Sequence, residues 1–114
     1  MAKIKIQDRE YSVEFNALAA MLYEQISEHN AFDLEYIQAN QMKYSLQVLY
    51  AMLLANNDNT PEFNDIVRSF KNQKELNDCM NIVAKEVEAW YKPMLKDIKA
   101  PKRNSKKGDD PKNA

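Results

Sequence analysis

Few side chains in this chain could do chemistry, and His29, the only histidine, is the first to consider. A histidine metal site or an acid–base pair needs a second histidine, a cysteine or a positioned carboxylate. Glu28 is adjacent to His29 and Glu24 lies about one helical turn away, but adjacent side chains on a helix do not converge. We therefore interpret His29 as a solvent-exposed residue at the end of a helix.

Cys79 is the only cysteine, so it cannot form a disulfide within the chain. It falls between Leu76 and Val83 on a predicted apolar helix face, where a free cysteine behaves as a small buried hydrophobic residue. A reactive thiolate needs a nearby cation or a helix N-terminus, and Cys79 is about two turns inside its predicted helix. The pattern therefore predicts that Cys79 packs in the core.

Two pairs of carboxylates share a helix face, Glu24 with Glu28 and Glu75 with Asp78. Paired carboxylates could act as general acid and base or bind a divalent cation. Near a helix start, however, Glu75 and Asp78 interact favourably with the helix dipole without any ligand. We therefore predict no catalytic residue, no metal site and no cofactor, and we expect a protein that is not an enzyme.

The glycine content excludes a further class of site. The only glycine is Gly108, so residues 1–107 lack the glycine-rich loops that bring backbone N–H groups close to a phosphate. Tight hairpin turns that depend on glycine are excluded as well, which favours a mainly helical protein. The apolar and charged fractions are 45% and 29%, as in a globular domain, and 114 residues can bury one core without disulfides.

The first 28 residues predict a short β-hairpin that leads directly into a helix. Polar and apolar residues alternate before and after the break at residues 7–10, and this two-residue period puts five apolar side chains on one face: Ile4, Ile6, Tyr11, Val13 and Phe15. Asn16 is a plausible N-cap for a helix to about Glu28. Its predicted apolar stripe is Leu18, Met21, Leu22 and Ile26, and His29-Asn30 is expected to end it, with Asn30 in the left-handed conformation.

Further helices follow from capping residues and apolar spacing. Asp33 caps a short helix that ends near Asn40, and a helix from about Met42 to Ala55 is apolar on nearly every face, which predicts a central, buried helix. Thr60-Pro61-Glu62 predicts the next helix start, with Thr60 as N-cap. Asn72 with Glu75 is a capping-box variant that begins the last helix, which Pro93 is expected to stop or kink.

These elements predict a mainly α fold, in which a short N-terminal β-hairpin packs on a compact bundle of four to five helices. Residues 1–99 form the single domain. Residues 100–114 have two prolines, the glycine and several charges without an apolar stripe, which predicts a disordered C-terminal tail.

Charge and hydropathy limit the partners. Residues 1–99 carry 11 basic and 15 acidic side chains, whereas residues 100–114 carry 5 basic and 2 acidic ones. Because phosphate binding needs clustered Lys and Arg, nucleic acid is an unlikely partner of the acidic body. No apolar run approaches the roughly 20 residues that span a bilayer. With one cysteine and no signal peptide, the chain is expected to be cytoplasmic.

The remaining signal is adaptable apolar surface. The chain has six methionines, six tyrosines and one tryptophan; methionine repacks easily, and Tyr and Trp are enriched at interfaces. Such residues either fill the core or leave a face that accepts an amphipathic helix. The candidate partner-binding residues are Tyr44, Tyr50, Met52, Trp90, Tyr91 and Met94. The same surface could also serve self-association into a homo-oligomer.

The order of these patterns resembles the small tail assembly chaperones of long-tailed bacteriophages and prophages. The likeness covers roughly residues 3–92: the strand pair at residues 4–15, the helix at 17–26, the short helix around 34–37 and the apolar helix at 45–54. It rests on patterns of hydrophobicity. This chain departs from the family where a glycine usually ends the first helix and His29-Asn30 stand instead.

The resemblance implies a chaperone that binds the helical tape-measure protein in the cytoplasm of the bacterial host cell. There it would keep this client soluble while the tail tube polymerises around it. Genes of this family often carry a programmed frameshift near their end, and Lys106-Lys107 could be encoded by a slippery heptamer. The alternative for this segment is an ordinary charged terminus.

Two other functions remain open from the sequence. One is a small helical nucleic-acid-binding or regulatory protein that uses the basic tail. The other is a phage structural connector component, which would stay in the finished particle, whereas a chaperone would not.

Overall fold

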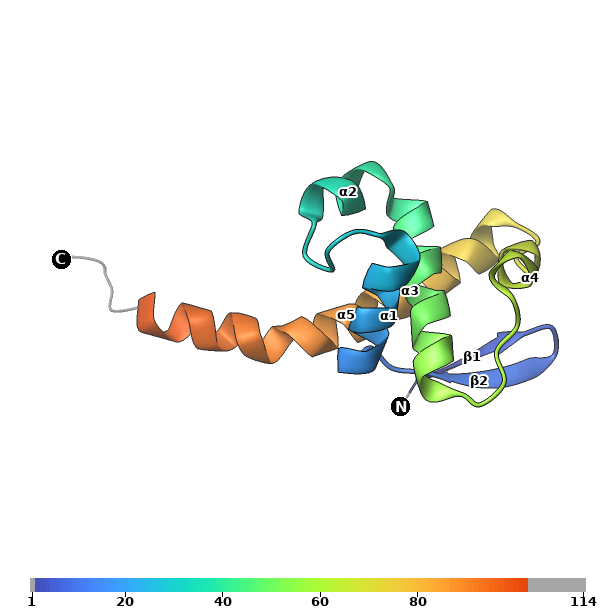
Figure 1. Ribbon diagram of the computed structural model, residues 1–114, viewed down its shortest axis with the longest axis horizontal. Helices are drawn as coiled ribbons and strands as arrows, with labels where there is room; N and C mark the ends of the chain where they lie inside the picture. The colour runs from blue at the N-terminus through green and yellow to red at the C-terminus, as the bar shows by residue number, and fades with distance from the viewer. Residues whose placement is uncertain (1, 103–114) are drawn as a thin grey trace.

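A computed structural model describes residues 2–102, with side chains described for residues 2–93. Two strands, β1 (Ala2–Ile6) and β2 (Arg9–Val13), form an antiparallel hairpin that precedes five helices. The molecule is elongated, with extents of 57 × 27 × 27 Å, because the last helix extends away from the other elements (Figure 1). The predicted mainly α fold with an N-terminal hairpin is confirmed.

The hairpin turn is tight although it contains no glycine. Ile6 pairs with Arg9, which leaves a two-residue turn of Gln7 and Asp8. Both have positive φ, 52° and 65°, as a type I′ turn requires. The sequence excluded only tight turns that depend on glycine, and this turn forms without one, because left-handed geometry costs a non-glycine residue only about 1 to 2 kcal/mol.

The apolar face of the hairpin packs on the central helix, α3 (Gln41–Asn56). All five alternating side chains predicted for that face, Ile4, Ile6, Tyr11, Val13 and Phe15, are buried. The third helix is buried along its middle, and Val48, Leu49, Met52 and Leu53 are among the largest buried side chains. The prediction of a central, buried helix is confirmed.

The first helix, α1 (Ala17–Ser27), presents a different face to the core from the one we expected. Asn16 is its N-cap, as predicted, and accepts a hydrogen bond from the Ala19 N–H at 2.9 Å. The buried face consists of Ala19, Tyr23 and Ser27. Leu22 and Ile26 of the predicted stripe are half-buried, whereas Leu18 and Met21 are 50% and 59% exposed.

The C-terminal end of α1 also differs from the prediction. Glu28 adopts the left-handed conformation, with φ of 61°, and its N–H donates to the Glu24 carbonyl. Asn30 was expected in this conformation, so the left-handed residue comes two positions earlier than predicted, whereas the last helical residue, Ser27, lies next to the predicted end at about Glu28. The next helix, α2 (Leu34–Ala39), is capped by Asp33, which accepts from the Tyr36 N–H at 3.1 Å, as predicted.

The start of α4 (Phe63–Arg68) lies later than the proline signal indicated. Its N-cap is Glu62. Thr60 instead donates its hydroxyl hydrogen to the Leu53 carbonyl at 3.1 Å, and so satisfies a group at the C-terminal end of α3. The prediction of Thr60 as N-cap was therefore wrong, because the end of the preceding helix binds its hydroxyl.

The last helix, α5 (Gln73–Lys102), begins as predicted after Asn72, which accepts from the Glu75 N–H at 2.9 Å. Glu75 reaches back to the Lys71 N–H at 2.8 Å and completes a variant of the capping box. Helix α5 continues through Pro93 and includes residues 100–102 of the predicted tail. Pro93 therefore does not stop the helix, although an interior proline removes a hydrogen bond of the ladder and crowds the preceding turn. Residues 103–114, with Lys106-Lys107, lie outside the described residues.

Candidate functional site

Four aromatic side chains from three parts of the chain meet where α5 leaves the other elements; we call Phe15, Phe32, Trp90 and Tyr91 the aromatic cluster. Phe15 lies 6.0 Å from Trp90 in an edge-to-face arrangement and 6.3 Å from Tyr91. Phe32 meets Tyr91 edge-to-face at 5.1 Å. These centroid distances are typical of favourable aromatic pairs.

Each member is positioned by a local feature of the fold. Phe15 is the last residue of the alternating hairpin pattern and directly precedes the Asn16 N-cap. Phe32 lies in the turn between α1 and α2, where the Glu24 carboxylate accepts the Ala31 N–H at 2.8 Å and the Asn30 side chain accepts the Phe32 N–H at 2.7 Å. Trp90 and Tyr91 are consecutive residues of α5.

The aromatic cluster is only partly covered. Phe15 is buried, while Phe32 is 58% and Trp90 41% exposed. Burial and the nearby Glu24 carboxylate raise the pKa of Tyr91, so its hydroxyl stays neutral at physiological pH. Helix α5 continues beyond Tyr91 to Lys102, a further length of roughly 16 Å. The cluster is thus a partly exposed aromatic surface near the start of this projecting segment. Figure 1 shows the segment extending away from the other elements.

Exposed apolar side chains are frequent on the rest of the molecule. Large hydrophobic residues with high exposure occur on α1, α2, α3, α4 and α5 and in the turn before α2. They are Leu18, Met21, Phe32, Leu34, Met42, Leu54, Val67 and Trp90.

The six predicted partner-binding residues do not form one site. Trp90 and Tyr91 both belong to the aromatic cluster. Tyr44 packs edge-to-face on Tyr23 at 5.4 Å, and its burial raises its pKa to about 12. Tyr50 is half-buried against Phe63 at 5.6 Å. Tyr44 and Tyr50 therefore stabilise internal contacts.

Met52 is 0% exposed, so its prediction as a partner contact was wrong: it lies on the side of α3 that faces the core. Met94 is in α5, but its side chain lies outside the described residues. Sequence reasoning missed Phe32. The available signal was the position of this apolar residue in a polar connection, with His29-Asn30 before it and Asp33 after it.

The residues with potential for chemistry are engaged elsewhere. Cys79 is buried, and burial raises the pKa of its thiol to about 12; the predicted core packing is confirmed. Glu75 binds the Lys71 N–H, and Asp78 pairs with Lys74 Nζ at 3.1 Å. Within residues 2–93, whose side chains are described, no group of three or more His, Cys, Asp or Glu residues could hold a metal ion.

His29 follows the end of α1 and is half-exposed. Its ring stacks on Tyr36 at 3.7 Å, and Nδ1 lies 3.4 Å from the Asp33 carboxylate. The Tyr36 N–H, followed by His29, lowers the pKa of Asp33. These contacts fasten the connection between α1 and α2 and so hold the turn that carries Phe32.

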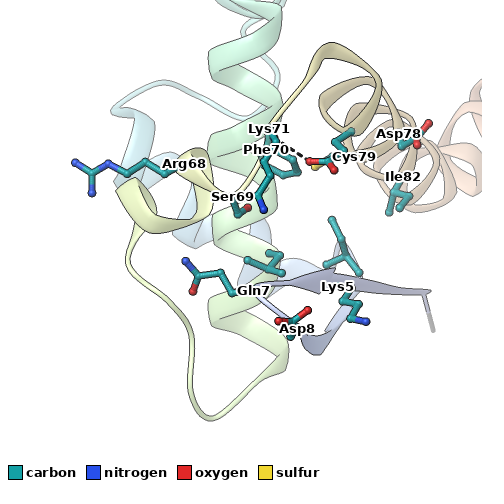
Figure 2. A pocket seen from close by; sticks show the side chains of 13 residues that line it. Lys5, Gln7, Asp8, Arg68, Ser69, Phe70, Lys71, Asp78, Cys79 and Ile82 are labelled. Atoms are coloured by element: carbon teal, nitrogen blue, oxygen red, sulfur yellow. Dashed lines mark hydrogen bonds between the residues drawn. The ribbon is translucent and has the colours of Figure 1, made fainter.

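A second surface feature is an open groove between the hairpin and the start of α5 (Figure 2). Its volume is about 580 Å³, and β1, the hairpin turn, the connection from α4 to α5 and the first turns of α5 line it. Apolar atoms come from Ile4, Ile6, Phe70 and Ile82, and charged side chains such as Lys5, Asp8 and Arg68 surround them. No helix among the described residues is long and apolar enough to cross a membrane.

We compared the chain with models of protein families, with curated proteins and with solved structures, and none of them matches it.

Proposed function

We propose that this protein is a non-enzymatic tail assembly chaperone that binds the helical tape-measure protein of a long-tailed phage and keeps it soluble during assembly of the tail tube. It would act in the cytoplasm of the bacterial host cell. The observation that carries the proposal is the partly exposed aromatic cluster at the base of the projecting part of α5. The resemblance in hydrophobic pattern to tail assembly chaperones is the reason for proposing the tape-measure protein as the client.

The aromatic cluster suits a helical client because its rings provide apolar contact area rather than polar groups that need a partner in a fixed direction. An amphipathic helix presents apolar side chains at intervals of three and four residues, which pack into apolar surfaces of this kind. The exposed rings of Phe32 and Trp90 would contact such a stripe, together with Tyr91, which stays neutral. A chaperone must also release its client, and partly exposed contacts provide moderate affinity.

The projecting part of α5 supplies a second element for the client. A helix that extends beyond the body can pack along another helix with crossing angles typical of helix pairs. In the sequence of α5, Val87, Trp90, Tyr91 and Met94 follow three- and four-residue spacing. This spacing continues the stripe that Cys79 and Val83 begin within the core.

Co-expression tests the proposal. The proposal predicts that a neighbouring gene encodes a long, helix-rich protein; this protein is produced with and without the chain, and its soluble fraction is measured. We expect a soluble complex with the natural chain and much less soluble client with Trp90→Ala. Lys92→Ala, an exposed change on the same helix, is the control and should leave solubility unchanged. A client that stays insoluble with the natural chain would overturn the proposal.

A further inference from the structure

The two edges of the hairpin are treated differently by the rest of the fold. At the outer edge of β2, the Asn57 side chain accepts the Ser12 N–H at 3.1 Å and donates to the Ser12 carbonyl at 2.9 Å. Asn56 donates to the Glu14 carbonyl at 2.9 Å. These two side chains take the place of a neighbouring strand at Ser12 and Glu14, so the end of the β2 edge next to α3 is satisfied.

The register shows which backbone groups of β1 point to its own free edge. In an antiparallel pair, residues whose N–H and C=O groups face the partner strand alternate with residues whose groups face away. Because the Ser12 groups face away from β1, those of its partner Lys3 face away from β2, and so do those of Lys5 two residues on. The Lys3 and Lys5 N–H groups have no hydrogen-bond partner among residues 2–102.

The free edge of β1 borders the groove described above. Figure 2 shows Lys5, Gln7 and Asp8 on one side of this groove and Phe70, Cys79 and Ile82 on the other. An added strand would lie about 4.8 Å from β1, and every second side chain would point toward the apolar lining of the groove. The volume of about 580 Å³ provides room for such side chains.

The charges on β1 indicate which kind of peptide would bind at its free edge. The Lys3 and Lys5 side chains are exposed on the face of the hairpin opposite Ile4 and Ile6, so acidic residues of an added strand would lie across from them, and such opposite-charge pairs are favourable. An antiparallel second copy of β1 centred on Ile4 would place Lys3 opposite Lys5, which is unfavourable. The nearby Glu75 and Asp78 already bind the Lys71 N–H and Lys74.

We propose that the free edge of β1 binds an extended peptide segment in which acidic and apolar residues alternate, as an added strand of the hairpin. The acidic side chains lie opposite Lys3 and Lys5, and the apolar side chains enter the groove between β1 and α5. This site is separate from the aromatic cluster and does not depend on the proposed chaperone function.

The probe is a short acetylated peptide of alternating valine and glutamate, titrated into the full-length chain, with a valine–lysine peptide as control. Amide exchange measured by NMR provides the readout for each position. In the free chain we expect fast exchange at Lys3 and Lys5 and slow exchange at Ser12. With the valine–glutamate peptide, Lys3 and Lys5 become protected, while the valine–lysine peptide leaves them unchanged.

Three variants separate backbone pairing from charge. Lys5→Pro removes an outward N–H at an edge position that tolerates proline; we expect affinity to fall roughly tenfold for the lost hydrogen bond and pairing geometry. Lys5→Ala keeps the N–H and should lose less. Lys3→Glu with Lys5→Glu keeps the strand and should reverse the preference, so that the valine–lysine peptide binds better.

The proposal is wrong if neither peptide binds saturably, or if exchange changes appear at Trp90 rather than at β1. It is also wrong if the double Glu variant keeps the original preference. Protection of Lys3 and Lys5 that rises with protein concentration without peptide would assign the edge to a second copy and overturn it as well. If Lys5→Pro does not fold, the double Glu variant still decides.

Discussion

The two halves of α5 differ in how far their apolar side chains are buried by the rest of the fold. Cys79 and Val83, in the first half, are buried against the hairpin and α3. Trp90, in the second half, is 41% exposed and packs edge-to-face on Phe15 of the aromatic cluster. The apolar spacing of α5 therefore continues beyond the part of the helix that is buried in the core. The first half should therefore govern stability, and the second half binding.

The strongest test of this difference is a buried charge in the first half. Val83→Asp places a carboxylate in the core without a partner, and we expect a loss of about 3 to 5 kcal/mol of unfolding free energy, measured by urea denaturation. Ala89→Asp, at an exposed site of the same helix, is the control and should change stability by about 0.5 kcal/mol or less. Equal losses in both variants would remove the distinction between the halves.

The next largest loss of stability is expected from a variant that creates a cavity beside α3. Met52 was a candidate partner contact by sequence but is fully buried. Met52→Ala should therefore destabilise the protein by about 2 to 5 kcal/mol, without reducing client binding per folded molecule. The same denaturation series, together with a pull-down at matched folded concentration, checks both parts. A loss of binding at unchanged stability would restore Met52 to the interface.

Alkaline pH should lower the unfolding free energy through Cys79, which lies in the buried first half of α5. Its pKa is raised to about 12 in the folded chain from about 9 in the unfolded chain. The unfolded state therefore releases the proton first, and the unfolding free energy falls as pH rises above 9. Between pH 9 and 10.5 this thiol should remove about 2 kcal/mol. Cys79→Val, which keeps an apolar side chain there, should show a flatter pH profile than the natural chain.

The smallest expected effect is at the end of α1. Glu28 adopts a left-handed conformation with φ of 61°, which glycine adopts without the steric cost of a side chain. Glu28→Gly should raise the unfolding free energy by about 1 kcal/mol. Glu28→Ala keeps a Cβ and is the control, which should not gain. Stabilisation by alanine alone would show that the left-handed conformation is not what limits stability here.

Much of the fold was predictable because strong local signals decide it. The alternation around the hairpin and the N-caps Asn16, Asp33 and Asn72 each depend on near neighbours, and the structure has all of them. Two of the errors come from contacts that the local sequence pattern does not contain. Thr60 lost its capping role to the end of α3, and the buried face of α1 was decided by Tyr23 meeting Tyr44.

The candidate site was predictable only in part. Trp90 and Tyr91 were recognised from their residue types, which are typical of interfaces. Their partners Phe15 and Phe32 come from positions 59 or more residues earlier in the sequence, and only the folded chain brings the four rings together. Residue type also failed to distinguish buried Met52 from exposed Met21, because exposure depends on how each helix is rotated against its neighbours.

Trp90 is the only tryptophan of the chain, so its fluorescence reports directly on the aromatic cluster. The most direct measurement is the emission spectrum during titration with a tryptophan-free helical fragment of the tape-measure protein. If the cluster binds the client, the emission shifts to shorter wavelength and acrylamide quenches it less as the complex forms. A complex that leaves both properties unchanged, or no complex at all, would contradict the assignment of this surface to the client.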